Sequence, residues 1–117
     1  MEISLNNIIT LHRGDTGKLE FDLTLNRYDS DFDHLYLGFT EPNQPWECAL
    51  MKKIADIIPA NTQGNYKAVF TFNHEDTENI LPGKYYYEVK LVRRSQTDVI
   101  GFETVETIRS KTIFYII

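Results

Sequence analysis

The stretch HEDTENILPGKYYYEVKL, residues 74–91, places a short acidic run and Leu-Pro-Gly directly before three consecutive tyrosines. Asn73, just before it, is a preferred helix-capping residue, and Glu75 and Asp76 suit the positive end of a helix dipole. The pattern predicts one helical turn through Asn79, which Leu-Pro-Gly ends. Over residues 84–93 every second residue is apolar, as in a strand with one buried face: these residues are Tyr85, Tyr87, Val89 and Leu91.

The same period of two continues towards the N-terminus. In residues 18–25 apolar and polar side chains alternate strictly, which is typical of a half-buried strand in an antiparallel sheet. Residues 3–11 form a further strand pattern, which residues 6–7 interrupt and which therefore indicates a bulge. The apolar side chains that share one phase in this segment are Ile3, Leu5, Ile9 and Leu11.

One further segment is ambiguous from its pattern alone. Residues 49–54 fit either a short strand or one face of a helix, and Pro45 and Pro59 favour the strand because they leave little room for a helix. The predicted strands cover residues 3–11, 18–25, 34–39, 49–54, 66–72, 84–93, 103–108 and 111–116.

About eight short strands at even spacing, with one short helical turn, predict an all-β fold: an immunoglobulin-like antiparallel β-sandwich of about seven to nine strands. Residues 1–117 are expected to form a single domain. In such sandwiches a tyrosine near a strand start bonds through its hydroxyl to backbone upstream. Tyr85 is the predicted structural tyrosine corner, with residues 76–79 supplying the turn. Tyr87 should point into the core, whereas Tyr86 faces a neighbour or solvent.

Composition and charge exclude several classes of partner. The chain has 117 residues and a formal charge of −5, and an acidic surface repels phosphate backbones, so nucleic acid is not an expected partner. No stretch approaches the ~20 apolar residues of a membrane span, which predicts no membrane insertion. The N-terminal sequence lacks a basic region followed by an apolar run, so no signal peptide is expected.

The segment DSDFDH, residues 29–34, resembles the start of a calcium loop because Asp29, Asp31 and Asp33 alternate. An EF-hand loop needs Gly at its sixth position and Glu at its twelfth, where this chain has His34 and Thr40. The EF-hand interpretation therefore fails. A solvated acidic loop is favoured over a looser calcium site, and no metal or cofactor is assigned.

No catalytic set is recognisable, which predicts that the chain is not an enzyme. Cys48 is the only cysteine and has no nucleophile signature around it, which favours a buried or inert thiol. The three histidines, His12, His34 and His74, show no metal-ligand spacing. The tripeptide Arg-Gly-Asp at residues 13–15 is explained by a turn.

Two features of the sequence favour contacts with other molecules. Trp46 lies in a loop that Pro42 and Pro45 stiffen, where it either stacks on a sugar ring or covers one end of the sandwich. The last strand is apolar on both faces, as in a strand that is buried twice or pairs with a partner at an edge. The predicted interaction residues are Phe114, Ile116, Tyr86 and Trp46.

Four motifs together resemble small structural proteins of tailed bacteriophages and prophages, which are similar to the immunoglobulin-like N-terminal modules of phage baseplate and tail-fibre components. These motifs are HRGDTGKLEFDL, LYLGFTEPNQPWECAL, EDTENILPGKYYYEVKL and VETIRSKTIFYI, and the resemblance spans residues 8–116. It implies a virion protein of the tail, baseplate or capsid surface, made in a bacterial cytoplasm. Its partners would be other virion proteins or further copies of itself. Unlike multidomain members, this chain is expected to lack an appended receptor-binding domain.

Two functional hypotheses follow. The first is a non-enzymatic virion module that acts through protein–protein contacts, with the two-sided last strand as its main support. The alternative is a carbohydrate- or cell-surface-binding β-sandwich that uses Trp46 and nearby acids.

Overall fold

The computed structural model describes residues 1–25, 28–60, 64–94 and 103–117. Strands account for most of the elements in this part of the chain, with one short α-helix and one 3-10 helix. In chain order the elements are β1 (Glu2–Ile3), β2 (Ile9–Leu11), β3 (Gly17–Thr24), β4 (Asp33–Thr40), the 3-10 helix η1 (Trp46–Cys48), β5 (Met51–Ile54), β6 (Asp56–Pro59), β7 (Asn65–Phe72), α1 (His74–Thr77), β8 (Gly83–Arg94) and β9 (Glu103–Ile116).

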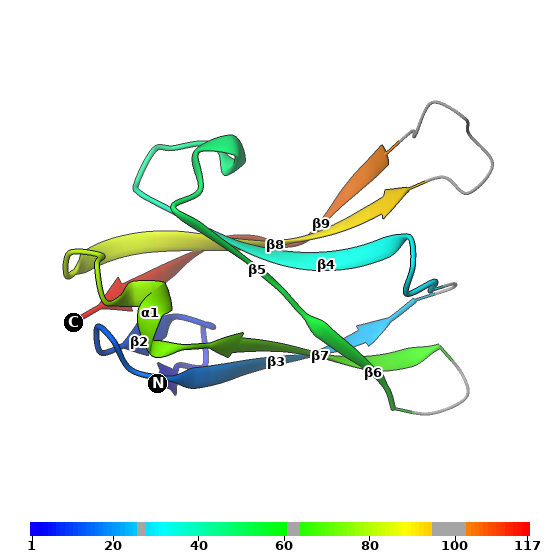
Figure 1. Cartoon of the computed structure of the whole chain (residues 1–117), viewed down its shortest axis with the longest axis horizontal. Coiled ribbons are helices and arrows are strands. Elements are labelled where there is room, and N and C mark those ends of the chain that lie inside the picture. Colours follow the sequence, from blue (N-terminus) through cyan, green and yellow to red (C-terminus); the bar gives the residue numbers. More distant parts are fainter. Residues whose placement is uncertain (26–27, 61–63, 95–102) are drawn as a thin grey trace.

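The strands form two sheets that pack face to face (Figure 1). One sheet has the order β1-β2-β9-β8-β4-β5, and the other has the order β3-β7-β6. In immunoglobulin lettering β3, β7 and β6 correspond to strands B, E and D, and β9, β8, β4 and β5 correspond to G, F, C and C′. The predicted immunoglobulin-like sandwich is confirmed, with one correction: β2 runs parallel to β9, and the other pairs are antiparallel.

The alternating residues identified in the sequence fill the space between the sheets. Apolar side chains of β3, β4, β7 and β8 point inward at every second position and are buried. Burial of one such side chain contributes roughly 1.5–3 kcal/mol, so the alternation is the main determinant of these four strands. The core side chains from them are Leu19, Phe21, Leu23, Leu35, Leu37, Phe39, Ala68, Phe70, Phe72, Tyr85, Tyr87, Val89 and Leu91.

The N-terminal segment is a hairpin and not one strand with a bulge. The backbone N–H of Ser4 donates to the carbonyl of Ile8 at 2.9 Å, and Ile3 pairs with Ile9. Asn7 takes a positive φ of 62°, which asparagine tolerates better than most residues and which a tight turn needs. As a result Leu5 lies in the turn and is fully exposed, although it shares the phase of buried Ile9.

β5 passes directly into β6, and the chain changes sheets between them. Ala55 is the only residue between the two strands, and its N–H donates to the carbonyl of Leu35 at 2.9 Å. β5 then pairs with β4, whereas β6 pairs with β7 in the other layer. The predicted strand over residues 49–54 is thus shorter than expected, and β6 was not predicted.

The two strands predicted over residues 103–108 and 111–116 are one continuous strand, β9. Tyr87 pairs with Thr112 and Lys90 with Thr107, so three steps along β8 match five steps along β9. β9 therefore holds two extra residues as bulges. The polar residues near position 110 interrupt the apolar pattern without ending the strand, because a bulge absorbs them.

α1 and the start of β8 form a tyrosine corner. The hydroxyl of Tyr85 donates to the backbone carbonyl of Leu81, four residues upstream. The acceptor is therefore Leu81 and not the predicted turn at residues 76–79. The Tyr85 ring stacks on Phe39 at a centroid distance of 4.7 Å, so this side chain joins the helix–strand connection to the core.

Candidate interaction surface

The side of the six-stranded sheet that faces away from the core carries most of the half-exposed aromatic residues. Residues directly opposite each other in an antiparallel pair point to the same side, so the register defines this surface. We call it the outer aromatic face. From β4, β5, β8 and β9 it contains His34, Tyr36, Gly38, Thr40, Lys52, Ile54, Lys84, Tyr86, Glu88, Lys90, Val92, Val105, Thr107, Ile113 and Tyr115.

Several apolar side chains on this face are open to solvent. The exposed fraction is 53% for Ile54, 57% for Val105 and 37% for Tyr115. The outer side of the three-stranded sheet is more polar, because β3 presents Lys18, Glu20, Asp22 and Thr24 there, all exposed, and the exposed apolar residue of β6 on that side is Ile58. The two outer sides are therefore unequal, and the outer aromatic face has the composition expected of a contact surface.

Trp46 lies across this face and is held by its neighbours. A Cβ atom added to Gly38 would lie 2.2 Å from Trp46 Cζ3, so the indole packs directly on the β4 backbone. Lys52 Nζ and Lys90 Nζ lie 4.8 Å and 5.2 Å from a Trp46 ring centroid. The indole ring is therefore already in contact with other groups of the chain, and a sugar ring would have to displace lysine ammonium groups to stack on it.

The loop of residues 41–50 that carries Trp46 folds over the sheet, as Figure 1 shows for the segment between β4 and β5. Lys111 Nζ donates to the Gln44 carbonyl at 2.7 Å. At the loop's end, Leu50 N–H donates to the Phe39 carbonyl at 2.8 Å. The loop is therefore bonded to both β9 and β4.

The structure separates the four predicted interaction residues. Trp46 and Tyr86 lie on the outer aromatic face and are half-buried, with Lys84 Nζ 5.6 Å from the Tyr86 ring centroid. Phe114 and Ile116 are 0% and 1% exposed and belong to the core, so their assignment to a contact surface is wrong.

The physical reason lies in the register of β9. Phe114 pairs with Tyr85, which faces inward, and its ring lies 4.9 Å from the Phe39 ring and 5.8 Å from the Phe72 ring. Both faces of this strand are apolar, so the sequence alone does not decide which face is buried. The outward residues are Ile113 and Tyr115.

The buried hydroxyl of Tyr87 lies at the centre of a small polar network next to the bulges of β9. Tyr87 is fully buried, and its hydroxyl donates to the Asn7 carbonyl at 2.6 Å and accepts from Arg109 Nη1 at 3.2 Å. Arg109 lies 4.3 Å from the Phe21 ring centroid. Burial raises the pKa of Tyr87 above its usual range, and the Arg109 guanidinium partly opposes this shift. The group joins β8, β9 and the N-terminal hairpin.

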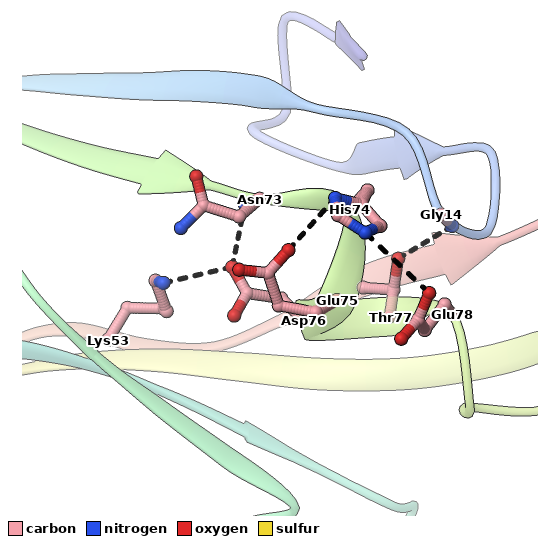
Figure 2. A network of polar contacts seen from close by, with 8 residues as sticks. All are labelled: Gly14, Lys53, Asn73, His74, Glu75, Asp76, Thr77 and Glu78. Carbon is pink, nitrogen blue, oxygen red and sulfur yellow. Dashed lines mark hydrogen bonds and ion pairs between the residues drawn. The ribbon is translucent and has the colours of Figure 1, made fainter.

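A second polar network surrounds α1 at one end of the sandwich (Figure 2). Asp76 accepts from the backbone N–H of Asn73 at 2.7 Å and pairs with Lys53 Nζ of β5 at 2.9 Å. Thr77, which is buried, accepts at its hydroxyl from the Gly14 N–H at 2.9 Å. The network links the β2–β3 turn, α1 and β5, and we interpret it as structural.

Other residues around α1 contribute less. His74 Nδ1 lies 2.9 Å from Glu75 and His74 Nε2 lies 3.9 Å from Glu78, and all three side chains are exposed. Such surface pairs contribute little to stability.

The acidic loop at residues 29–33 uses its carboxylates within the chain. Asp33 is 5% exposed and accepts from the Asp29 N–H at 3.0 Å, while Asp29 accepts from the Asp31 N–H at 2.9 Å. These bonds form a turn that leads into β4. In the part of the chain that the structure describes, no three His, Cys, Asp or Glu side chains are grouped as a metal site requires.

Cys48 lies at the end of η1 and is exposed, so of the two expected alternatives, a buried or an inert thiol, the structure excludes the buried one. Neither of the two described helices has the length or the apolar sequence that a membrane-spanning helix requires. Comparisons with protein-family models, with curated proteins and with solved structures find no significant match to this chain.

Proposed function

We propose that this chain is a non-enzymatic structural module of a tailed-bacteriophage virion and acts through protein–protein contacts. The observation that carries the proposal is the inequality of the two outer sides. One presents Tyr36, Tyr86, Ile113 and Tyr115 across three adjacent strands, and the other is mainly polar. Large aromatic side chains on an otherwise rigid sheet are the groups that dominate binding energy at protein interfaces.

The virion assignment rests on the sequence motifs described above and on the sandwich fold. Its test is the composition of particles. Mass spectrometry of density-purified particles from the bacterium that carries the gene should find this chain at constant ratio to the major particle proteins. Its presence only in the soluble fraction would refute the assignment.

A matched pair of variants tests which surface docks. Tyr86→Asp with Tyr115→Asp should reduce incorporation into particles, because two anionic groups would replace the aromatic contacts. Thr24→Asp with Thr71→Asp changes the outer side of the three-stranded sheet by the same charge and should leave incorporation unchanged. Both variants must keep the wild-type melting temperature, and equal incorporation of both would refute the outer aromatic face as the docking surface.

Binding of a glycan remains the competing proposal. A glycan array with bound sugars, and a change in Trp46 fluorescence on binding, would favour it over the virion module. We rank it second because Gly38, Lys52 and Lys90 already contact the indole.

A further inference from the structure

The edge of the three-stranded sheet at β3 is long and regular. In the described residues β3 pairs on one side only, with β7, over eight positions from Gly17 to Thr24. The other outer strands are shorter: β1 has two residues, and β5 and β6 have four each, with Pro59 ending β6. β9 is also open beyond the end of β2, but bulges interrupt its ladder. A long unblocked edge is a template for pairing with a further strand.

The first residues of the chain have the pattern of the strand that would fit there. In residues 1–6 apolar Met1, Ile3 and Leu5 alternate with polar residues. The hairpin leaves this pattern mostly unused, because Ile3 is 45% exposed, Leu5 is fully exposed, and β1 forms only two residue pairs. In an immunoglobulin sandwich the first strand lies beside strand B, which is β3 in this molecule.

The chain's own N-terminal segment does not use this edge, although it lies nearby. A Cβ atom added to Gly17, the first residue of β3, would lie 3.0 Å from Met1 Cβ. The chain reverses at the turn of residues 4–8, where Asn7 has a positive φ. Opening that turn would free an extended arm of residues 1–7 that is roughly 23 Å long at ~3.3 Å per residue, long enough for its residues 3–7 to pair along the second half of β3 and Leu25.

We propose that the edge of β3 accepts the N-terminal arm, residues 1–7, of a second copy of this chain. The arm runs antiparallel to β3, so that its residues 3–7 lie opposite residues 21–25, with Leu5 opposite Leu23 and Asn6 opposite Asp22. In this register Ile3 and Leu5 share the buried side with the inward residues of β3, and exposed apolar surface is removed from water. Exchange of arms between copies joins them without a new folded element. The inference goes beyond the proposed function, because it concerns a sheet edge and holds for any role of the outer aromatic face.

Cross-linking between two full-length chains tests the register. In the Cys48→Ser background, a chain with Asn6→Cys is mixed with a chain carrying Asp22→Cys, and a short bismaleimide is added. The matched control carries Ile58→Cys, because Ile58 and Asp22 both pair with Lys67 and so lie in one row at opposite edges of the same sheet. We expect the covalent heterodimer with Asp22→Cys and not with Ile58→Cys. Equal yields from both partners, or none from either, would overturn the proposal.

Sedimentation velocity supplies a measurement that needs no cross-linker. The sedimentation coefficient of the wild-type chain should increase with protein concentration because chains associate, and Leu5→Asp should abolish this increase. Leu81→Asp, which also replaces an exposed leucine, should retain it. A wild-type chain that stays monomeric at all concentrations overturns exchange. So does a chain carrying both Asn6→Cys and Asp22→Cys that links only within itself.

Discussion

At the scale of single residues, Tyr85 shows how a side chain can be assigned a structural role before the fold is known. Its position after Pro-Gly and at the start of a strand predicted a hydroxyl bond to upstream backbone. The bond exists, but its acceptor is the Leu81 carbonyl, because α1 ends at Thr77 and the chain then turns back towards the ring. The residue type was predictable, whereas the acceptor depends on where the helix stops.

Replacement of Tyr85 by Phe should lower the free energy of unfolding by about 1 kcal/mol, the typical value of one such hydrogen bond. The ring and its stacking on Phe39 would be retained. Urea denaturation measures the change. Tyr115→Phe is the control, because this side chain is 37% exposed and should be neutral. An unchanged midpoint for Tyr85→Phe would show that the bond to Leu81 does not contribute.

Position 38 must be glycine for Trp46 to pack as it does, which the sequence alone did not reveal. Gly38→Ala would place a methyl group 2.2 Å from Trp46 Cζ3, so the indole must move. We expect a loss of about 1–3 kcal/mol, as for other overpacked sites, and a red shift in the emission of Trp46, the only tryptophan. Gly83→Ala is the control, since its nearest neighbour would be Tyr85 Cε2 at 3.7 Å. Identical emission from both variants would contradict the packing described.

At the scale of elements, β9 marks the limit of pattern reading. Period two predicted β3, β4 and β7 correctly, because each has one apolar and one mainly polar face. β9 is apolar on both faces near its end, so only its pairing with β8 determines which of its side chains point into the core. β6 was missed because Asp56–Pro59 is short and ends in proline. The parallel pairing of β2 with β9 joins residues about a hundred positions apart, which no local pattern encodes.

Neighbouring substitutions in β9 test the corrected phase. Phe114→Ala should destabilise the fold by about 3–5 kcal/mol, because it removes a fully buried ring. Tyr115→Ala should stay within about 0.5 kcal/mol of the wild type, as is usual for exposed positions. Thermal denaturation of both variants gives the comparison. The reverse order of stabilities would restore the original assignment of Phe114 to the outer side.

The helix α1 depends on Asp76 more than on its other acids. Asp76→Ala removes both the bond to the Asn73 N–H and the ion pair with Lys53, whose side chain is 19% exposed. We expect a loss of about 1–2 kcal/mol, at the upper end for a helix cap. Glu75→Ala, in the same turn, loses only a surface pair with His74 and should change stability by less than about 0.5 kcal/mol. Equal effects in urea denaturation would contradict this difference.

At the scale of the whole molecule, alkaline pH should weaken the fold through buried Tyr87 and half-buried Tyr28. Burial raises the pKa of Tyr87 above the usual value of 10.0, and burial followed by the charge of Asp33 does the same for Tyr28. A raised pKa means that the folded state favours the protonated hydroxyl. The resulting stabilisation is complete below about pH 10 and is lost as pH rises through the folded-state pKa values.

Urea denaturation at a series of pH values measures this dependence. The wild-type free energy of unfolding should decline above about pH 10, and Tyr87→Phe should decline less steeply, although it is less stable at neutral pH because it loses two hydrogen bonds. Adding Tyr28→Phe should flatten the alkaline limb further. Parallel curves for all three chains would show that these hydroxyls do not govern the alkaline transition.

The passage from β5 to β6 through Ala55 gives the sandwich a mechanical property. The backbone crosses from one sheet to the other at a single residue, Ala55, whose N–H donates to the carbonyl of Leu35. We therefore expect a shear force applied to one sheet to be transmitted to the other directly through the backbone at Ala55. An inserted glycine-rich linker after Ala55 should lower the force at which single molecules yield.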